Sequence, residues 1–222
     1  MTNSTKDIRK KRKREIKRKI IIDCAEDAFT KKGFSESTLD EIALNSGNTK
    51  ATIYNYFASK EDLLAAVMPR TYEKFITIFR KESQSTDKKS GLRILSESYI
   101  TFDRIYPGHS ELLNSGEVLL LSKNVYSKFE RNEELTESEN EYKQSEDEIG
   151  KLFVEIIYQF IRPTKREEDF PLKMGRVIYY FTFTIREAIR RRYLLQNDKE
   201  NDEILEIILS ILEEGIKSYL QK

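Results

Sequence analysis

A short segment around residue 50 carries side chains suited to reading a DNA duplex. Lys50, Ala51, Thr52, Tyr54 and Asn55 lie within six residues of one another. An Asn amide can pair bidentately with an adenine edge in the major groove, and Thr can hydrogen-bond a base or touch a thymine methyl. Lys and Tyr are suited to phosphate oxygens, and Ala permits close approach. This pattern predicts a base-reading surface if the segment is helical.

Such a surface requires a helix that turns its apolar side inward. At about 100° per residue, Ile53 and Phe57 point to one side of a helix that Thr49 caps, whereas Ala51 and Asn55 point to the other. We expect this helix to end near Phe57.

The preceding residues predict a second short helix and the turn that joins the two. Thr38-Leu39-Asp40-Glu41 is a capping box, in which the Thr hydroxyl accepts the amide of residue 41 and Glu41 reaches back. Ser46-Gly47-Asn48 supplies the turn. Helix, turn and helix together form a helix-turn-helix. The amide end at Thr38 can also hold a phosphate.

A longer helix precedes this pair and ends near Lys32. Its apolar residues recur every three or four positions, and Gly33 with Phe34 predicts a left-handed cap with its hydrophobic follower. The fourth predicted helix begins at the cap Ser59 and continues to about Glu82, with Pro69 inside it. The apolar residues of the first of these helices are Ile20, Ile21, Cys24, Ala25, Ala28 and Phe29.

The charge of the chain is concentrated at its start. Residues 1–20, which we name the basic arm, carry ten basic and two acidic side chains, a local charge of +8, whereas the whole chain carries +1. The arm can lie along phosphates or enter a minor groove, as arms of helix-turn-helix proteins do. Its alternatives are a solvated tail or a membrane-surface segment. Within it we predict DNA contacts from Arg12, Lys13 and Arg14.

Composition excludes several classes of protein. The chain has 222 residues, one Cys and one His, so neither an intrachain disulfide nor a Cys/His zinc cluster is expected, and we expect no cofactor. The longest apolar run has six residues, far short of a membrane span. Asp23 interrupts the apolar residues after the basic start, which does not fit a signal peptide. We expect a soluble, cytoplasmic protein.

The second half of the chain predicts further helices and several candidate ligand contacts. We expect one helix over Ser110–Ser122, and an exposed, partly mobile acidic stretch over Glu130–Glu148, with nine acids and two bases. An aromatic stripe is more often core than a ligand site, and His109 at a helix start is more often a capping or exposed residue. The candidate ligand contacts are Tyr99, Phe102, Tyr106, His109, Phe129, Phe153 and Tyr158.

The last two predicted helices, over 170–195 and 204–220, have apolar faces too wide for one neighbour. A helix that is apolar on most sides is buried on most sides. We therefore expect these helices to form a homodimer contact. The residues predicted for it are Tyr180, Phe183, Ile208, Leu209, Leu212 and Ile216.

Residues 21–67 resemble the DNA-binding domain of the tetracycline-repressor (TetR) family. The match runs without a gap over about a fifth of the chain. Three positions depart from the family pattern: Asn48 stands where an apolar residue is usual, Ala51 where Gly is frequent, and Tyr56 where His is common. The matching residues are Ala25, Phe29, Gly33, Phe34, Thr38, Ile42, Ala43, Gly47, Lys50, Tyr54, Phe57, Lys60, Leu63 and Leu64.

This resemblance implies an all-α fold of about nine helices. Residues 1–69 would form the arm and a three-helix DNA-binding domain, and residues 70–222 a helical domain for effector binding and dimerisation. It implies a homodimeric regulator, usually a repressor, whose second domain binds a small ligand. The abundance of Phe and Tyr favours an apolar or aromatic ligand, and a two-fold dimer should read a palindromic operator. The residues at the family's DNA-contacting positions are Thr38, Lys50, Ala51, Thr52, Tyr54, Asn55, Tyr56 and Lys60.

Three alternatives differ from a ligand-released repressor. The first is a helix-turn-helix DNA-binding protein with no small-molecule inducer, controlled by a partner protein or acting architecturally. The second is an enzyme, which lacks support because the chain shows no nucleophile–base signature, metal spacing or Gly-rich phosphate loop. The third is an adaptor that uses the basic arm at a membrane surface.

Overall fold

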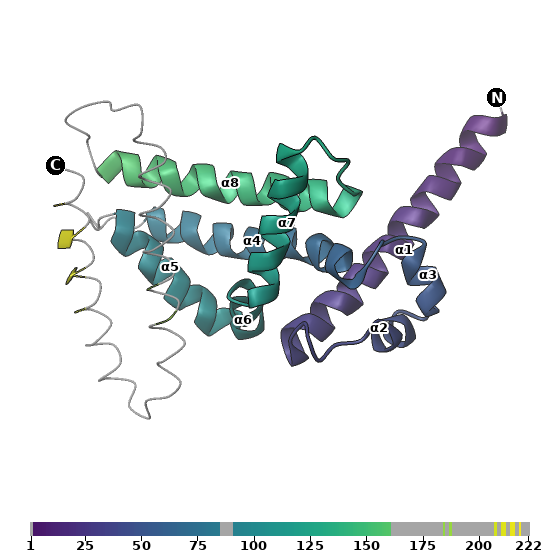
Figure 1. Ribbon diagram of the computed structural model, residues 1–222, viewed down its shortest axis with the longest axis horizontal. Coiled ribbons are helices and arrows are strands. Elements are labelled where there is room, and N and C mark those ends of the chain that lie inside the picture. Colours follow the sequence, from purple (N-terminus) through teal and green to yellow (C-terminus); the bar gives the residue numbers. More distant parts are fainter. Residues whose placement is uncertain are drawn as a thin grey trace. The chain divides into compact units, whose positions relative to one another are not determined.

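The structure is a computed structural model that describes residues 2–84 and 91–160, together with 184, 187, 207, 210, 211, 214, 215 and 218. All regular structure within this part of the chain is helical, which confirms the predicted all-α class (Figure 1). No helix within it is both long enough and apolar enough to cross a bilayer. The helices are α1 (Thr2–Lys32), α2 (Leu39–Asn45), α3 (Lys50–Tyr54), α4 (Lys60–Ser83), α5 (Gly91–Ile105), α6 (Pro107–Leu113), α7 (Gly116–Glu130) and α8 (Glu137–Phe160).

The chain divides into two compact units. The first unit consists of Met1–Tyr72 and Pro107–Glu146, and the second of Glu73–Tyr106 and Asp147–Lys222. Helices α4 and α8 each contribute residues to both. The division of function at residue 69 remains a prediction.

The core of the first unit is built on one face of α1. Ile21, Ala25 and Phe29 are completely or almost completely buried there, as their spacing predicts. The helix ends as predicted, because Gly33 has a φ of 84° and its amide donates to the carbonyl of Phe29 at 3.0 Å. The ring of Phe34 then packs 5.2 Å from that of Phe29. This cap directs the chain into α2.

The single helix predicted over Ser110–Ser122 is wrong, since the structure has two helices there. Helix α6 ends at Leu113 and α7 begins at Gly116. Ser115 separates them because its hydroxyl accepts the amide of Val118 at 3.4 Å and so caps α7. Asn114-Ser115-Gly116 is a turn signal at this break, which the prediction of one helix passed over.

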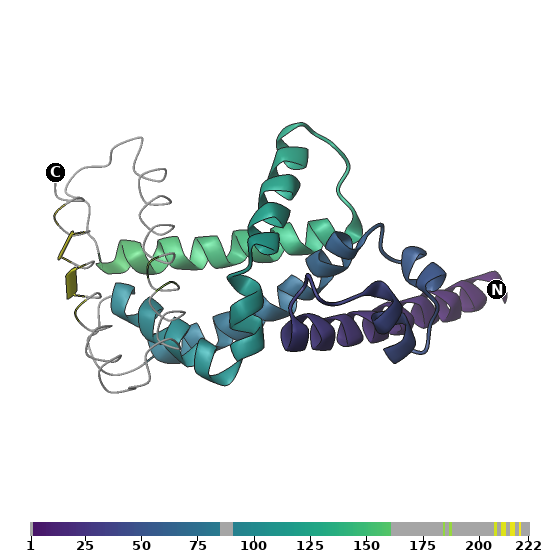
Figure 2. The same ribbon diagram turned by 60° about the horizontal axis from the view of Figure 1, so that its bottom comes forward.

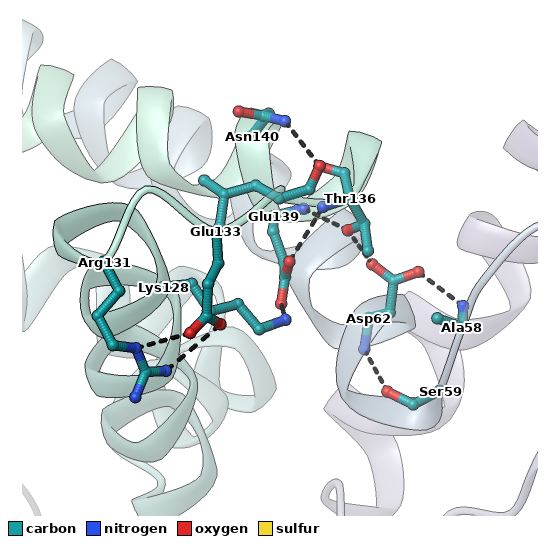
Figure 3. A network of polar contacts seen from close by, with 10 residues as sticks. Ala58, Ser59, Asp62, Lys128, Arg131, Glu133, Thr136, Glu139 and Asn140 are labelled. Atoms are coloured by element: carbon teal, nitrogen blue, oxygen red, sulfur yellow. Dashed lines mark hydrogen bonds and ion pairs between the residues drawn. The ribbon is translucent and has the colours of Figure 1, made fainter.

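The acidic stretch Glu130–Glu148 is only in part the exposed segment that its charge predicted, since residues 130–134 are exposed but Ser138, Glu139 and Tyr142 are buried. Glu139 is buried and accepts hydrogen bonds from Lys128 at 2.6 Å and from the amide of Thr136 at 3.0 Å. Figure 3 shows how the Thr136 hydroxyl also donates to Asp62, at 2.5 Å. Tyr142 is completely buried nearby. Residues 136–146 are therefore packed into the first unit, because their acids find donors on α7 and their polar side chains reach α4.

Asp62 fixes the start of α4 from the other side of this network. Its carboxylate accepts the backbone amide of Ala58 at 2.8 Å, and its own amide donates to Ser59 at 3.0 Å (Figure 3). Ser59 thus caps α4 as predicted. The start of the helix that follows α3 is tied in this way to the segment between α7 and α8.

Candidate nucleic-acid interface

Helix α2 begins where the sequence predicts, with one difference in its cap. Thr38 is extended, and its hydroxyl accepts the amide of Glu41 at 3.2 Å. The Glu41 carboxylate does not complete the capping box, because it pairs with the ammonium of Lys32 at 2.5 Å. An ion pair with the end of α1 replaces the expected bond and joins the two helices. Thr38 itself is exposed.

The turn between α2 and α3 explains the unusual residue at position 48. Gly47 has a φ of 65°, and the amide of Asn48 donates to the carbonyl of Ala43 at 2.8 Å. The Asn48 side chain donates to the carbonyl of Ser46 at 2.8 Å and to its hydroxyl at 3.1 Å. Asn48 therefore holds the turn with hydrogen bonds where the family usually places an apolar side chain.

Helix α3 presents the face that the sequence predicts, although it ends at Tyr54 rather than near Phe57. Ile53 and Phe57 are buried, whereas Ala51 and Asn55 are exposed. Tyr54 keeps 51% of its surface exposed. The face available to a duplex therefore contains a small residue, an amide and a phenol.

Two other predicted contacts of α3 are already engaged within the protein. The Thr52 hydroxyl lies 2.9 Å from that of Thr49, the residue that caps the helix. The Lys50 ammonium pairs with Asp40 at 2.8 Å, and this hydrogen bond raises the pKa of Lys50. An exposed pair of this kind adds little stability. Lys50 can therefore exchange its carboxylate partner for a phosphate.

Lys60 faces the loop after α1. Its ammonium donates to the carbonyl of Phe34 at 2.5 Å and lies 4.2 Å from the centre of the Phe34 ring. Burial lowers the pKa of Lys60. In this arrangement Lys60 joins the start of α4 to the end of α1, and its predicted phosphate contact remains a prediction.

The basic arm is the first part of one continuous helix with the rest of α1. Arg12, Lys13 and Arg14 are all exposed on it. The Arg14 guanidinium lies 5.1 Å from the centre of the Tyr56 ring, just after α3. Two predicted DNA contacts, 42 positions apart, are thus brought together. Nothing in their spacing could reveal this contact.

Arg18 is a residue of this region that the sequence did not single out. Its guanidinium lies 5.5 Å from the centre of the Phe57 ring and donates to Glu141 at 2.8 Å. The same group contacts Glu137 at 3.6 Å and the hydroxyl of Ser138 at 3.3 Å. Arg18 therefore joins α1 to the end of α3 and to α8. In the sequence it is one of ten bases and carries no distinguishing signal.

The candidate ligand contacts divide between the two units. In the second unit, Tyr99, Phe102 and Phe153 surround Phe75, with ring centres 4.5, 5.4 and 5.8 Å from it. Tyr106 packs against Phe102 at 5.9 Å. The structure thus brings four of the seven predicted residues into one aromatic cluster. The side chain of Tyr158 lies outside the described residues.

The other two candidates, His109 and Phe129, belong to the first unit. His109 is buried, so the prediction that it caps a helix or lies exposed is wrong. Its Nδ1 lies 3.0 Å from the Thr71 hydroxyl and its Nε2 lies 3.2 Å from Glu26. Phe129 is 55% exposed, and the Lys143 ammonium lies 4.1 Å from the centre of its ring. His109 is thus a partner of α1 and α4 within the first unit.

The six residues predicted for the dimer contact, between Tyr180 and Ile216, lie outside the described residues. Among the residues that are described, no group of three or more His, Cys, Asp and Glu side chains is placed to hold a metal ion.

Comparison with known proteins identifies the same segment. Residues 21–67 match the family described as bacterial regulatory proteins, tetR family. A transcriptional activator of Mycolicibacterium smegmatis, FasR, is 29% identical over 90 residues, which are 40% of this chain and 41% of FasR. A fatty acid metabolism regulator protein of Bacillus subtilis is 28% identical over 81 residues, 36% of this chain and 42% of that protein. The matched segments therefore span less than half of either relative.

Similarity of fold extends over most of the chain. The fatty acid degradation regulator FadR of Bacillus halodurans superposes with a TM-score of 0.54, covering 88% of this chain and 94% of FadR. Its sequence identity is 16%, so the comparison shows a shared fold. Together with the geometry of α2 and α3, these matches identify the helix-turn-helix as the candidate site.

Proposed function

Because this chain belongs to the tetR family of bacterial regulatory proteins through residues 21–67, we propose that it is a sequence-specific DNA-binding transcription regulator. The observation that carries the proposal is the exposed face of α3. Ala51 and Asn55 are exposed, while Ile53 is buried against the rest of the helix-turn-helix. A helix held in this way can enter a major groove and place an amide against a base edge.

Phosphate contacts surround the base-reading face in this proposal. Tyr54, Lys50 and Thr38 are exposed at the same two helices. Such contacts fix the register of the protein on the duplex without reading sequence. Thr52, which can hydrogen-bond a base, completes the DNA-contacting set at the family's positions together with Tyr56 and Lys60.

The basic arm supplies the attraction to DNA that the helix-turn-helix lacks. Residues 21–69 contain four bases and eight acids, so this segment carries no net positive charge. Arg12, Lys13 and Arg14 are exposed on the arm and provide positive charge beside α3. Association with a polyanion depends on such charge.

We further propose that the regulator is a homodimeric repressor that binds a palindromic operator. In such a dimer, the two helix-turn-helix units are related by a two-fold axis. They read two half-sites whose spacing is set by the dimer. The wide apolar faces predicted over 170–195 and 204–220 support this, because each needs more than one neighbour.

The proposed effector is an apolar ligand of the fatty acyl class. The aromatic cluster around Phe75 offers an apolar environment in the second unit. The names of the Bacillus subtilis and Bacillus halodurans proteins refer to fatty acid metabolism and degradation. A ligand releases DNA only if it binds the DNA-incompetent state more tightly.

Sequence selection from random duplex DNA by the purified full-length protein tests the function. We expect recovery of a palindrome. Recovery of no preferred sequence would contradict sequence-specific regulation. Palmitate and palmitoyl-coenzyme A, added to the complex with the selected duplex, test the effector class. Release by either would support the proposal, whereas unchanged binding with both would favour control by a partner protein.

Replacing Asn55 with Ala should relax preference at a single base pair of each half-site. A bidentate pair between an amide and a base edge is worth about 1–3 kcal/mol of discrimination. Binding to the selected duplex and to duplexes mutated one base pair at a time measures this. Tyr54→Ala is the matched control, since removal of a phosphate contact should weaken all duplexes alike. If Asn55→Ala also weakens all duplexes equally, Asn55 does not read a base.

A further inference from the structure

The first part of α1 is an exposed helix with charge on every side. Residues 6–17 are all exposed, and both views show the N-terminal end of α1 projecting beyond α2 and α3 (Figures 1 and 2). At about 100° per residue, consecutive bases such as Lys10, Lys11, Arg12 and Lys13 point in four directions around the axis. A helix polar on all sides has no face that protein core must cover.

This distribution of charge fits a polyanion better than a membrane surface. A helix that lies in a membrane interface separates an apolar face from a basic one. Ile8 and Ile16 are 62% and 52% exposed, but Arg12 falls between them on the helix surface. The arm therefore lacks the continuous apolar face that insertion among lipid headgroups requires.

The basic side chains of the arm also repel one another when no anionic partner is bound. Lys6 and Lys10, Arg9 and Lys13, and Lys13 and Lys17 are like-charged pairs four residues apart. Like charges at this spacing destabilise a helix. A row of phosphates lying along the helix would relieve this repulsion.

The direction of the arm is fixed at its base by contacts with the helix-turn-helix. Arg14 lies against Tyr56, and Arg18 contacts both Phe57 and Glu141. Because α1 is continuous from Thr2 to Lys32, residues before Arg14 follow the direction set there. A helix is about 10–12 Å wide with its side chains, whereas a minor groove is about 6 Å wide. The arm therefore cannot enter a minor groove as an extended arm does.

We propose that residues 6–17 form a helical rod that binds the phosphates of duplex DNA flanking each half-site, outside the base pairs that α3 reads. This inference rests on the proposed function for the position of α3 on the duplex. The rod is about 18 Å long at 1.5 Å per residue. At 3.4 Å per base pair this corresponds to about five base pairs on each side of the palindrome. The rod adds affinity without adding sequence preference.

The test compares two duplexes and two variants of the full-length protein. The short duplex ends at the edges of the selected palindrome, and the long duplex adds ten base pairs of random sequence on each side. The arm variant is Lys10→Gln/Lys11→Gln/Lys13→Gln, which leaves Arg14 and Arg18 in place. The control variant, Lys81→Gln/Lys123→Gln/Lys151→Gln, removes the same charge from exposed lysines of α4, α7 and α8.

We expect the wild-type and control proteins to bind the long duplex about tenfold or more tightly than the short one in about 0.1 M salt. The arm variant should show no such difference, because its affinity for the long duplex should fall much more than its affinity for the short one. The slope of log K against log salt concentration should be less steep for the arm variant than for the wild-type protein. The difference should be about 0.9 for every phosphate that the variant no longer neutralises. Equal affinity of the wild-type protein for both duplexes would overturn the proposal.

Two further outcomes separate this proposal from others. If no palindrome is selected, random duplexes of 20 and 40 base pairs replace the pair above. A lower affinity of the arm variant for these duplexes, with the wild-type and control proteins binding equally, would then support the rod. It would do so even though sequence-specific regulation had been contradicted. Co-sedimentation with vesicles of phosphatidylcholine and phosphatidylglycerol tests the membrane alternative. Vesicle binding that needs the arm lysines, together with a DNA affinity that does not depend on duplex length, would overturn the proposal in favour of a lipid surface.

Discussion

Gly108→Ala should destabilise the protein, because α6 approaches α1 too closely for a side chain. A Cβ at residue 108 would overlap the backbone carbonyl oxygen of Thr30 and lie 2.9 Å from the Thr30 Cβ. Because the overlapped atoms of Thr30 belong to a helix backbone, they cannot move aside as the end of a flexible side chain can. We expect the free energy of unfolding to fall by about 1–3 kcal/mol or more, measured by urea denaturation.

Gly116→Ala is the matched control, since nothing lies within 4 Å of the Cβ it would add at the start of α7. Its stability should be unchanged or raised by up to about 1 kcal/mol, because Ala restricts the unfolded chain. Equal stability of the two variants would show that α1 and α6 do not approach as closely as described. Gly108 therefore permits the close packing of α6 against α1, in addition to its place with Pro107 at the end of the preceding helical pattern.

Phe75→Ala should strongly destabilise the second unit. The Phe75 side chain is completely buried and lies against Phe79, Tyr99, Phe102 and Phe153. Truncation removes buried apolar surface and leaves a cavity between rings from three helices. We expect the free energy of unfolding to fall by about 3–5 kcal/mol. Urea denaturation of the full-length protein measures it.

Phe129→Ala removes the same atoms from an exposed ring and serves as the control. This ring contacts the Lys143 ammonium, and a cation–π pair at an exposed site is worth about 0.5–1 kcal/mol. We expect the decrease in stability to stay within that range. If Phe75→Ala costs as little as Phe129→Ala, the rings around Phe75 are not closely packed.

The local features of the candidate site could be predicted from the sequence. The caps at Thr38 and Thr49, the turn at Gly47 and the opposite faces of Ile53 and Asn55 all appear where expected. Each depends on residues within four positions of one another, whose hydrogen bonds and helical phase are set by the local chain. The same locality explains the failure at Glu41, because its actual partner, Lys32, belongs to another helix.

Features that depend on distant partners could not be predicted. His109 is buried because Glu26 and Thr71 lie within hydrogen-bonding distance of its two ring nitrogens. The acidic stretch packs because Lys128 and Thr136 satisfy Glu139. Composition reports the charge of such residues but not whether a partner neutralises it, and burial of a charged group is favourable only when one does.

The sequence by itself determined the all-α class, the helix-turn-helix and the face of α3 that can meet a duplex, since short-range periodicity and capping encode them. Only the tertiary structure decided that the basic arm continues α1 as a helix anchored by Arg14 and Arg18, and that Phe75 collects the aromatic rings of three helices. These contacts join residues 24 to 123 positions apart. Their formation depends on which helix faces meet in the folded chain, a choice that no local pattern records.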